Sequence, residues 1–163
     1  VKNRTQAAGK IILFGHSAGG QFVHRWALLG GKKNVDVIAV ANSGWFTMPD
    51  RDIDYPYGIK NVGITDEELG EAFAEPVILF MGEKDVERKP PFRDTPEADA
   101  QGMNRMERCM NYFRQCKAKA EELRVPFRWK LETVEGVAHQ GVKMAEGAAY
   151  IFGKSSEDGN RRV

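Results

Sequence analysis

The sequence lacks an apolar run that could cross a bilayer, and it carries almost no net charge. A membrane-spanning helix needs about 18 or more consecutive apolar residues, and no apolar run here approaches that length. The formal net charge is +1, which gives no reason to expect nucleic acid or an anionic membrane surface as a partner. The first residues, Val-Lys-Asn-Arg-Thr-Gln, do not form a signal peptide. We expect a soluble chain; its compartment stays open, because a signal peptide could lie on a preceding segment.

Cysteine and histidine are scarce, and the spacing of the two cysteines excludes a disulfide between them. The two cysteines, Cys109 and Cys116, fall in an expected helix about 10 Å apart along its axis, whereas a disulfide needs Cα atoms within about 7 Å. We expect two buried free thiols. No Cys-x-x-Cys motif or Cys/His cluster is present, so the sequence indicates neither a metal nor an organic cofactor.

The arrangement of apolar residues predicts one α/β domain with a parallel sheet. The 163 residues, 42% of them hydrophobic, suffice for one domain with a real core. Helical spacings separate the strand patterns, as in parallel crossover units. The predicted strands cover residues 11–14, 35–41, 77–81 and 127–134. The predicted helices end near residues 9, 30, 73, 123 and 152, and residues 153–163 are expected to form a polar, frayed tail.

A Gly-x-Ser-x-Gly motif, Gly15-His16-Ser17-Ala18-Gly19, directly follows the first predicted strand and opens a helical pattern. In a nucleophile elbow this spacing holds the serine in a strained turn at the end of the sheet, where a side chain at either glycine would collide with its surroundings. The Ala18 N–H then points to the place where an oxyanion would form. A Gly-rich turn without catalytic role has the same pattern, but the flanking strand and helix favour the elbow.

A nucleophilic serine needs a base to accept its proton, and the sequence offers three histidines. His139 lies in a Gly-flanked loop after the last predicted strand, on the same side of the sheet as Ser17, so we expect it to be the general base. His16 would point away from the hydroxyl of Ser17, and His24 lies two turns along the next helix. Both are expected to be structural, although His16, beside the nucleophile, is also a candidate for binding substrate.

The base must be oriented by an acid, and Asp85 is the expected residue. It follows the third predicted strand, in a loop from which a carboxylate can reach an imidazole on the neighbouring fourth strand. A solvated loop carboxylate is the alternative for any such residue. The rival acids are Glu83 and Glu87 in the same loop, and Asp50, Asp52 and Asp54 after the second strand.

A long segment without helical or strand period, residues 42–63, follows the second predicted strand. Loops of this length inside a compact domain are usually functional or disordered, and the aromatic content argues against disorder. Because the segment leaves the carboxyl end of a strand, it lies on the ligand-binding side of the sheet. We expect some of its aromatic residues to wall the substrate pocket; alternatively, they simply cover the sheet. The candidates are Trp45, Phe46, Tyr55 and Tyr57.

The order Ser17, Asp85, His139 is the order of catalytic residues in the α/β-hydrolase fold, and the chain resembles the C-terminal half of such a hydrolase. The sequences GHSAGG, SGWF, GEKD and GVAH are similar to those of serine esterases of the polyhydroxybutyrate depolymerase and feruloyl esterase type. The resemblance implies a Ser17–His139–Asp85 triad that hydrolyses carboxylic esters through an acyl-enzyme. Residues 1–152 would be the C-terminal half of one domain, followed by the tail 153–163.

The resemblance also implies that half of a sheet is missing. The family's sheet has eight strands, and the four predicted here match the fifth through eighth. The loop that supplies the second oxyanion-hole N–H would lie in the other half, and the first strand here would present an apolar, unpaired edge, which native proteins avoid. We expect a second polypeptide segment to complete the sheet.

Two other kinds of function fit the same pattern. One is an α/β-hydrolase-like module that binds a ligand without turnover. The other is a peptidase or thioesterase, since acyl-group chemistry is shared within the fold and selectivity lies in the pocket walls. The aromatic segment favours bulky or polymeric esters as substrates.

Overall fold

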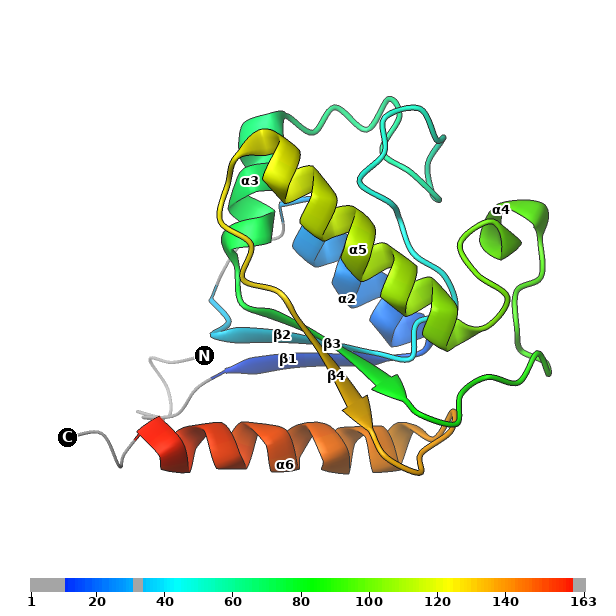
Figure 1. Ribbon diagram of the computed structural model, residues 1–163, viewed down its shortest axis with the longest axis vertical. Coiled ribbons are helices and arrows are strands. Elements are labelled where there is room, and N and C mark those ends of the chain that lie inside the picture. The colour runs from blue at the N-terminus through cyan, green and yellow to red at the C-terminus, as the bar shows by residue number, and fades with distance from the viewer. Residues whose placement is uncertain (1–10, 31–33, 160–163) are drawn as a thin grey trace.

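The fold is a four-stranded parallel sheet with helices on both faces, as the sequence predicts (Figure 1). The computed structural model describes residues 11–30 and 34–159, with side chains up to residue 152. The expected helix end at residues 5–9 lies outside the described residues. The strand order is β1-β2-β3-β4 and every pair is parallel. The strands are β1 Ile12–His16, β2 Val37–Ala41, β3 Val77–Gly82 and β4 Lys130–Val134.

The helices form two layers around the sheet. Helices α2 (Ala18–Leu28), α3 (Asp66–Ala74) and α5 (Arg105–Leu123) cover one face, and α6 (Gly141–Gly159) covers the other (Figure 1). A short helix that the sequence pattern did not predict, α4 (Pro96–Asp99), lies in the excursion after β3. In the described ranges, no helix combines the length and apolar character that a bilayer crossing requires.

Local signals explain where two of these helices begin and end. The sequence Thr65-Asp66-Glu67-Glu68 has the spacing of a capping box, and α3 begins with one: the Thr65 side chain accepts from the Glu68 N–H, and the Glu68 side chain accepts from the Thr65 N–H. At α5 the Asn104 side chain accepts from the Glu107 N–H, and the helix ends at Arg124 in the left-handed conformation. These caps satisfy backbone groups that the helices leave without partners.

The core lies mainly between the sheet and the three helices α2, α3 and α5, with a smaller cluster under α6. The methionines at helical spacing in the sequence, Met103, Met106 and Met110, would be expected to face the core, but Met103 lies before α5 and is 53% exposed, and Met110 is 40% exposed. The first turns of α5 instead bury two arginines, Arg105 and Arg108. Further along, Cys109 and Cys116 are buried free thiols, as predicted.

Two boundaries differ clearly from the sequence prediction, at the start of β4 and at the end of α6. Strand β4 begins at Lys130 rather than at residue 127, because the Arg128 N–H and the Trp129 indole N–H donate to carbonyls at the end of α3 instead of pairing with β3. Helix α6 continues to Gly159, so the first part of the expected tail is helical. Strand β1 is not buried on both faces: Ile12 is 38% exposed, since β1 forms an edge of the described sheet.

Candidate active site

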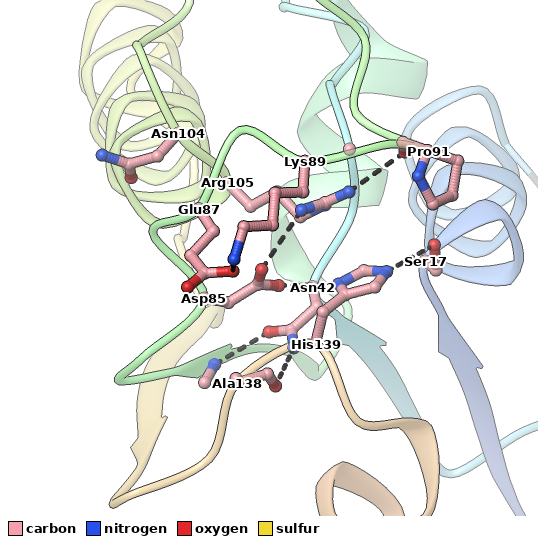
Figure 2. A network of polar contacts seen from close by, with 12 residues as sticks. Ser17, Asn42, Asp85, Glu87, Lys89, Pro91, Asn104, Arg105, Ala138 and His139 are labelled. Carbon is pink, nitrogen blue, oxygen red and sulfur yellow. Dashed lines mark hydrogen bonds and ion pairs between the residues drawn. The ribbon is translucent and has the colours of Figure 1, made fainter.

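Each of the four strands delivers one polar residue just beyond its carboxyl end. These residues are Ser17 after β1, Asn42 after β2, Asp85 after β3 and His139 after β4. Because parallel strands end at the same edge of a sheet, the four side chains come together there, although they are far apart in sequence (Figure 2). The site is therefore a product of strand order and register.

Ser17 occupies a strained turn between β1 and α2. Its φ of 57° and ψ of −116° are unusual for a residue with a side chain, and its N–H donates to the Ala41 carbonyl oxygen at 2.9 Å. A Cβ atom at Gly15 would lie 2.4 Å from the Gly19 carbonyl oxygen, as the elbow reading requires. The turn thus depends on a glycine immediately before His16.

The expectation of a collision at the second glycine of the motif is wrong. A Cβ atom at Gly19 would meet nothing within 4 Å, whereas one at Gly20 would lie 2.6 Å from Ser43 Oγ and 2.8 Å from the Ala41 carbonyl oxygen. Gly19 is on the exposed side of the first turn of α2, and Gly20 is buried against the end of β2. The close packing of α2 on the sheet therefore requires Gly20.

His139 bridges the serine and the aspartate. Its Nδ1 lies 2.7 Å from Asp85 Oδ2 and its Nε2 lies 2.9 Å from Ser17 Oγ. Since an ionised carboxylate can only accept, Nδ1 carries the hydrogen, and Nε2 of the neutral ring is left to accept from the serine hydroxyl. The Asp85 side chain is 4% exposed and that of His139 26%. The three residues predicted to meet are thus within hydrogen-bond distance, in the arrangement of nucleophile, base and acid.

The second oxygen of Asp85 also has a partner. Oδ1 accepts from Nη1 of Arg105 at 3.2 Å, and both side chains are about 95% buried. The rival acids in the same loop lie elsewhere: Glu83 accepts from the Gly136 N–H, and Glu87 is paired with Lys89 in solvent. Of the carboxylates after β2, two contact their own loop, where Asp50 accepts from the Asp52 N–H and Asp54 pairs with Lys60.

Asn42 joins the ends of β2 and β3 to the histidine loop. Its side-chain oxygen accepts from the Gly82 N–H at 2.8 Å, and its side-chain nitrogen donates to the carbonyl oxygen of Ala138 at 3.1 Å. It is 4% exposed and has a positive φ of 45°, which asparagine tolerates better than most residues. The residue before His139 is thereby tied to the sheet. In the sequence, Asn42 is only the first residue of the long segment after the second predicted strand.

The other two histidines have different environments. The His16 ring packs against the His139 ring with centroids 4.7 Å apart, and its Nε2 is buried with no hydrogen-bond partner among the described residues. Burial, followed by the nearby His139, lowers the pKa of His16; Asp85 opposes this shift and Arg105 adds to it. His24 is fully buried, with Nε2 accepting from the Thr47 N–H and Nδ1 beside the Gly20 carbonyl, and burial lowers its pKa to about 3. His24 is structural, as predicted.

The four aromatic candidates separate in the structure. Phe46 is fully buried, stacks on Tyr112 and belongs to the core rather than to a pocket wall. Trp45 and Tyr57 pack against each other, with ring centroids 4.9 Å apart, and are 6% and 8% exposed. Tyr55 is 53% exposed. Among the described residues, no ring contact or hydrogen bond joins these four to Ser17 or His139, so a substrate role for Trp45, Tyr55 and Tyr57 stays a prediction.

A large cavity of about 640 Å³ lies away from these residues. Its lining comes from the amino ends of the strands, with Ile12, Val37 and Val77, and from the segment before β4 with Phe127 and Trp129. Ser17 and His139 follow the opposite, carboxyl ends of their strands. The cavity is therefore not the place where a substrate would meet the serine.

An open parallel α/β sheet with a serine, a histidine and an aspartate at the carboxyl ends of its strands is the arrangement of a hydrolase-type fold. The chain is similar to poly(aspartic acid) hydrolase-1 from Sphingomonas sp. KT-1, with 34% identity and a TM-score of 0.84, covering 90% of this chain and 56% of that one. It is also similar to LpqC, a poly(3-hydroxybutyrate) depolymerase from Bordetella parapertussis, with 32% identity and a TM-score of 0.80, covering 88% and 50%.

The chain has the α/β-hydrolase type of fold, and the resemblance to polyhydroxybutyrate depolymerases noted in the sequence is confirmed. It spans about half the length of the two similar structures. No protein-family model matches the sequence, and no curated protein does.

Proposed function

We propose that this chain carries the catalytic triad of a serine hydrolase that cleaves carboxylic esters. The observation that carries the proposal is the continuous hydrogen-bonded path from Ser17 Oγ through both ring nitrogens of His139 to Asp85 Oδ2, at 2.9 and 2.7 Å. A serine hydroxyl is a weak nucleophile until a positioned base accepts its proton. Both similar proteins are named for hydrolysis of a polymer, which supports the same reaction class.

The reaction has two halves. Ser17 Oγ forms a bond to the ester carbonyl carbon as its proton passes to His139 Nε2; the carbon–oxygen bond to the alcohol then breaks, and the alcohol leaves with that proton. Water next gives a proton to the same nitrogen as it attacks the acyl-enzyme, and the bond to Oγ breaks as the proton returns to Ser17. Asp85 stays ionised, fixes the ring tautomer and stabilises the imidazolium.

The first N–H of α2, from Ala18, is the proposed oxyanion-hole donor. It belongs to the first turn of α2, where N–H groups have no acceptor within the helix, and it directly follows the nucleophile. A second donor is proposed to come from a segment outside this chain. The proposed role of His16, whose ring packs against the His139 ring, is to hold the His139 ring in place beside the substrate site.

The segment that completes the sheet is proposed to pair with β1. Among the described strands, β1 pairs with β2 alone. Apolar side chains are exposed on β1 and next to it, at Ile11 and Ile12, and on α2, which packs on β1, at Phe22. An apolar, unpaired edge strand is a site of association. The proposal predicts that residues 1–163 by themselves do not form a soluble, cooperatively folded, active monomer, and such a monomer would refute it.

Labelling and turnover test the triad. A fluorophosphonate probe should label wild-type protein, and Ser17→Ala should abolish labelling. On a short p-nitrophenyl ester, Asp85→Asn should lower kcat by about 10⁴-fold, because the tautomer is lost, and His139→Ala by several orders of magnitude. Glu83→Gln is the matched control: its amide oxygen can still accept from the Gly136 N–H, so its activity should stay near wild type. Full activity of Asp85→Asn, or a loss of activity in Glu83→Gln alone, would show that Asp85 is not the acid of the triad.

Hydrolysis of amide-linked polymers is the second candidate, favoured by the similarity to a poly(aspartic acid) hydrolase. The same triad serves both reactions, since His139 can protonate a leaving amine as well as an alcohol. Comparing kcat/KM on ester and amide oligomers of matched length distinguishes the two. If the folded protein binds such oligomers saturably but releases no product and takes no probe, it is a binding module instead.

A further inference from the structure

Arg105 is a charged residue in a place where charge is costly. It is the first residue of α5, and its side chain is 5% exposed. Nη1 donates to Asp85 Oδ1 and Nη2 donates to the Pro91 carbonyl oxygen at 3.1 Å (Figure 2). The guanidinium also lies over the Phe92 ring, 5.0 Å from its centroid. Its Nε is buried and has no partner among the described residues. Two hydrogen bonds and one aromatic ring thus hold the side chain in place, while the Nε–H lacks an acceptor among the described residues.

Stability alone does not account for this arginine. Taking two opposite charges out of water costs about as much as their attraction returns, and well-packed apolar residues often replace such pairs without loss. Here one donor is left unpaired, which makes the arrangement poorer still. The methylene groups of a methionine could cover Phe92 equally well. What an apolar residue could not supply is a donor for the second oxygen of Asp85.

The orientation of the Asp85 carboxylate is set by its two oxygens. His139 Nδ1 holds Oδ2 and Arg105 Nη1 holds Oδ1, so rotation of the carboxylate would break both contacts. Without Arg105, Oδ1 would be a buried acceptor, and the carboxylate could turn to seek another donor. The His139 ring would then lose the fixed partner that defines its tautomer and its angle toward Ser17.

We propose that Arg105 is a positioning residue of the active site, which acts on the reaction only through Asp85. This rests on the proposed function, since it assigns a role within the same triad. The contacts of the Arg105 guanidinium are with Asp85, the Pro91 carbonyl and the Phe92 ring, and none of them is with Ser17. Its loss should therefore lower kcat and leave KM nearly unchanged.

A double-mutant cycle tests this, with every variant made in the active form of the protein. Arg105→Met should lower kcat by about 10- to 100-fold, the usual cost of losing a partner that orients a functional group, with KM within about twofold of wild type. Arg105→Lys keeps a cation that can reach one acceptor and should recover part of the loss. In an Asp85→Asn background, Arg105→Met should change kcat by less than about threefold, because the group that it acts through is already disabled.

The matched control is Arg88→Met. Arg88 also lies over Phe92, at 4.9 Å, but it pairs with Asp99 and does not contact Asp85, so kcat should stay within about twofold. If Arg105→Met fails to fold, as judged by near-UV circular dichroism, the same cycle is run with Arg105→Lys. An equal fold-loss in both backgrounds, a change in KM rather than kcat, or no loss at all would each overturn the proposal. Wild-type protein without labelling or turnover would instead refute the proposed function itself.

Discussion

Two adjacent glycines at the start of α2, Gly19 and Gly20, offer a matched test of how Ser17, the proposed nucleophile, is held in its turn. Both lie in the first turn, so replacement by alanine gives each the same gain in helix propensity, up to about 1 kcal/mol. The difference between the variants isolates the collision at Gly20, where a Cβ atom would lie 2.8 Å from the Ala41 carbonyl oxygen, against 3.4 Å for an ordinary contact. The backbone must therefore shift by about 0.6 Å, an overpacking that typically costs about 1–3 kcal/mol.

The shift also has a consequence for the reaction. The Ala41 carbonyl oxygen is the acceptor of the Ser17 N–H, so displacing it moves the nucleophile away from His139. We expect Gly20→Ala to be about 1–3 kcal/mol less stable than Gly19→Ala in urea denaturation, and to react with a fluorophosphonate at least tenfold more slowly, since small misplacements of reacting groups are costly. Equal urea midpoints and equal labelling rates for the two variants would refute the packing described for this turn.

Three further predictions concern buried groups. Because the folded pKa of His24, about 3, lies below its ordinary 6.5, the unfolded state binds more protons between these values; stability should fall by up to about 1.4 kcal/mol per pH unit below 6.5 and not above it. His24→Gln should show a correspondingly shallower fall in urea titrations from pH 7 to 4. Asn42→Asp keeps the acceptor for the Gly82 N–H but loses the donor to Ala138; kcat should drop more than for Asn61→Asp, which changes an exposed asparagine with a similar positive φ. Burial raises the pKa of the Cys109 thiol, so neither cysteine should react with a thiol reagent until the protein unfolds, and rapid native reaction would contradict the described core.

The features that the sequence predicts well are those with a local pattern. The apolar runs at β2 and β3, the capping box at Thr65 and the Gly-x-Ser-x-Gly turn each depend on residues close together in the chain. The meeting of Ser17, Asp85 and His139 is not local, but it follows once the strands are parallel and adjacent, because each residue then falls at the same edge. Their order along the chain adds the resemblance to α/β-hydrolases.

The features that sequence reasoning missed depend on partners far along the chain. From the sequence, Arg105 would be expected on a solvent-exposed helix face. Its burial is explained only by its contact with Asp85, 20 residues earlier in the chain. Asn42 reads as a loop residue, yet its partners lie 40 and 96 residues away. Phe46 belongs to an aromatic segment of the kind that often lines a pocket, and only its stacking on Tyr112 shows that it lies in the core. The hydrogen bond from the Asn42 side chain to the loop that carries His139 produces no periodic pattern or motif in the sequence, so it cannot be predicted from the sequence.

The proposed division of the site between this chain and a second segment separates two parts of catalysis. The proposed nucleophile, base and acid come from one chain, in which Asn42 is hydrogen-bonded to the residue before the base and Arg105 to the acid. The two groups proposed to exchange the proton, Ser17 Oγ and His139 Nε2, are therefore both supplied by this chain. Stabilisation of the oxyanion, by contrast, needs a second donor in addition to Ala18, and removing one such donor typically costs about 10²–10³-fold in kcat. The second segment is accordingly expected to supply both the strand pairing that the sheet needs in order to fold and the second oxyanion donor, whereas the hydrogen bonds among Ser17, His139 and Asp85 come from this chain.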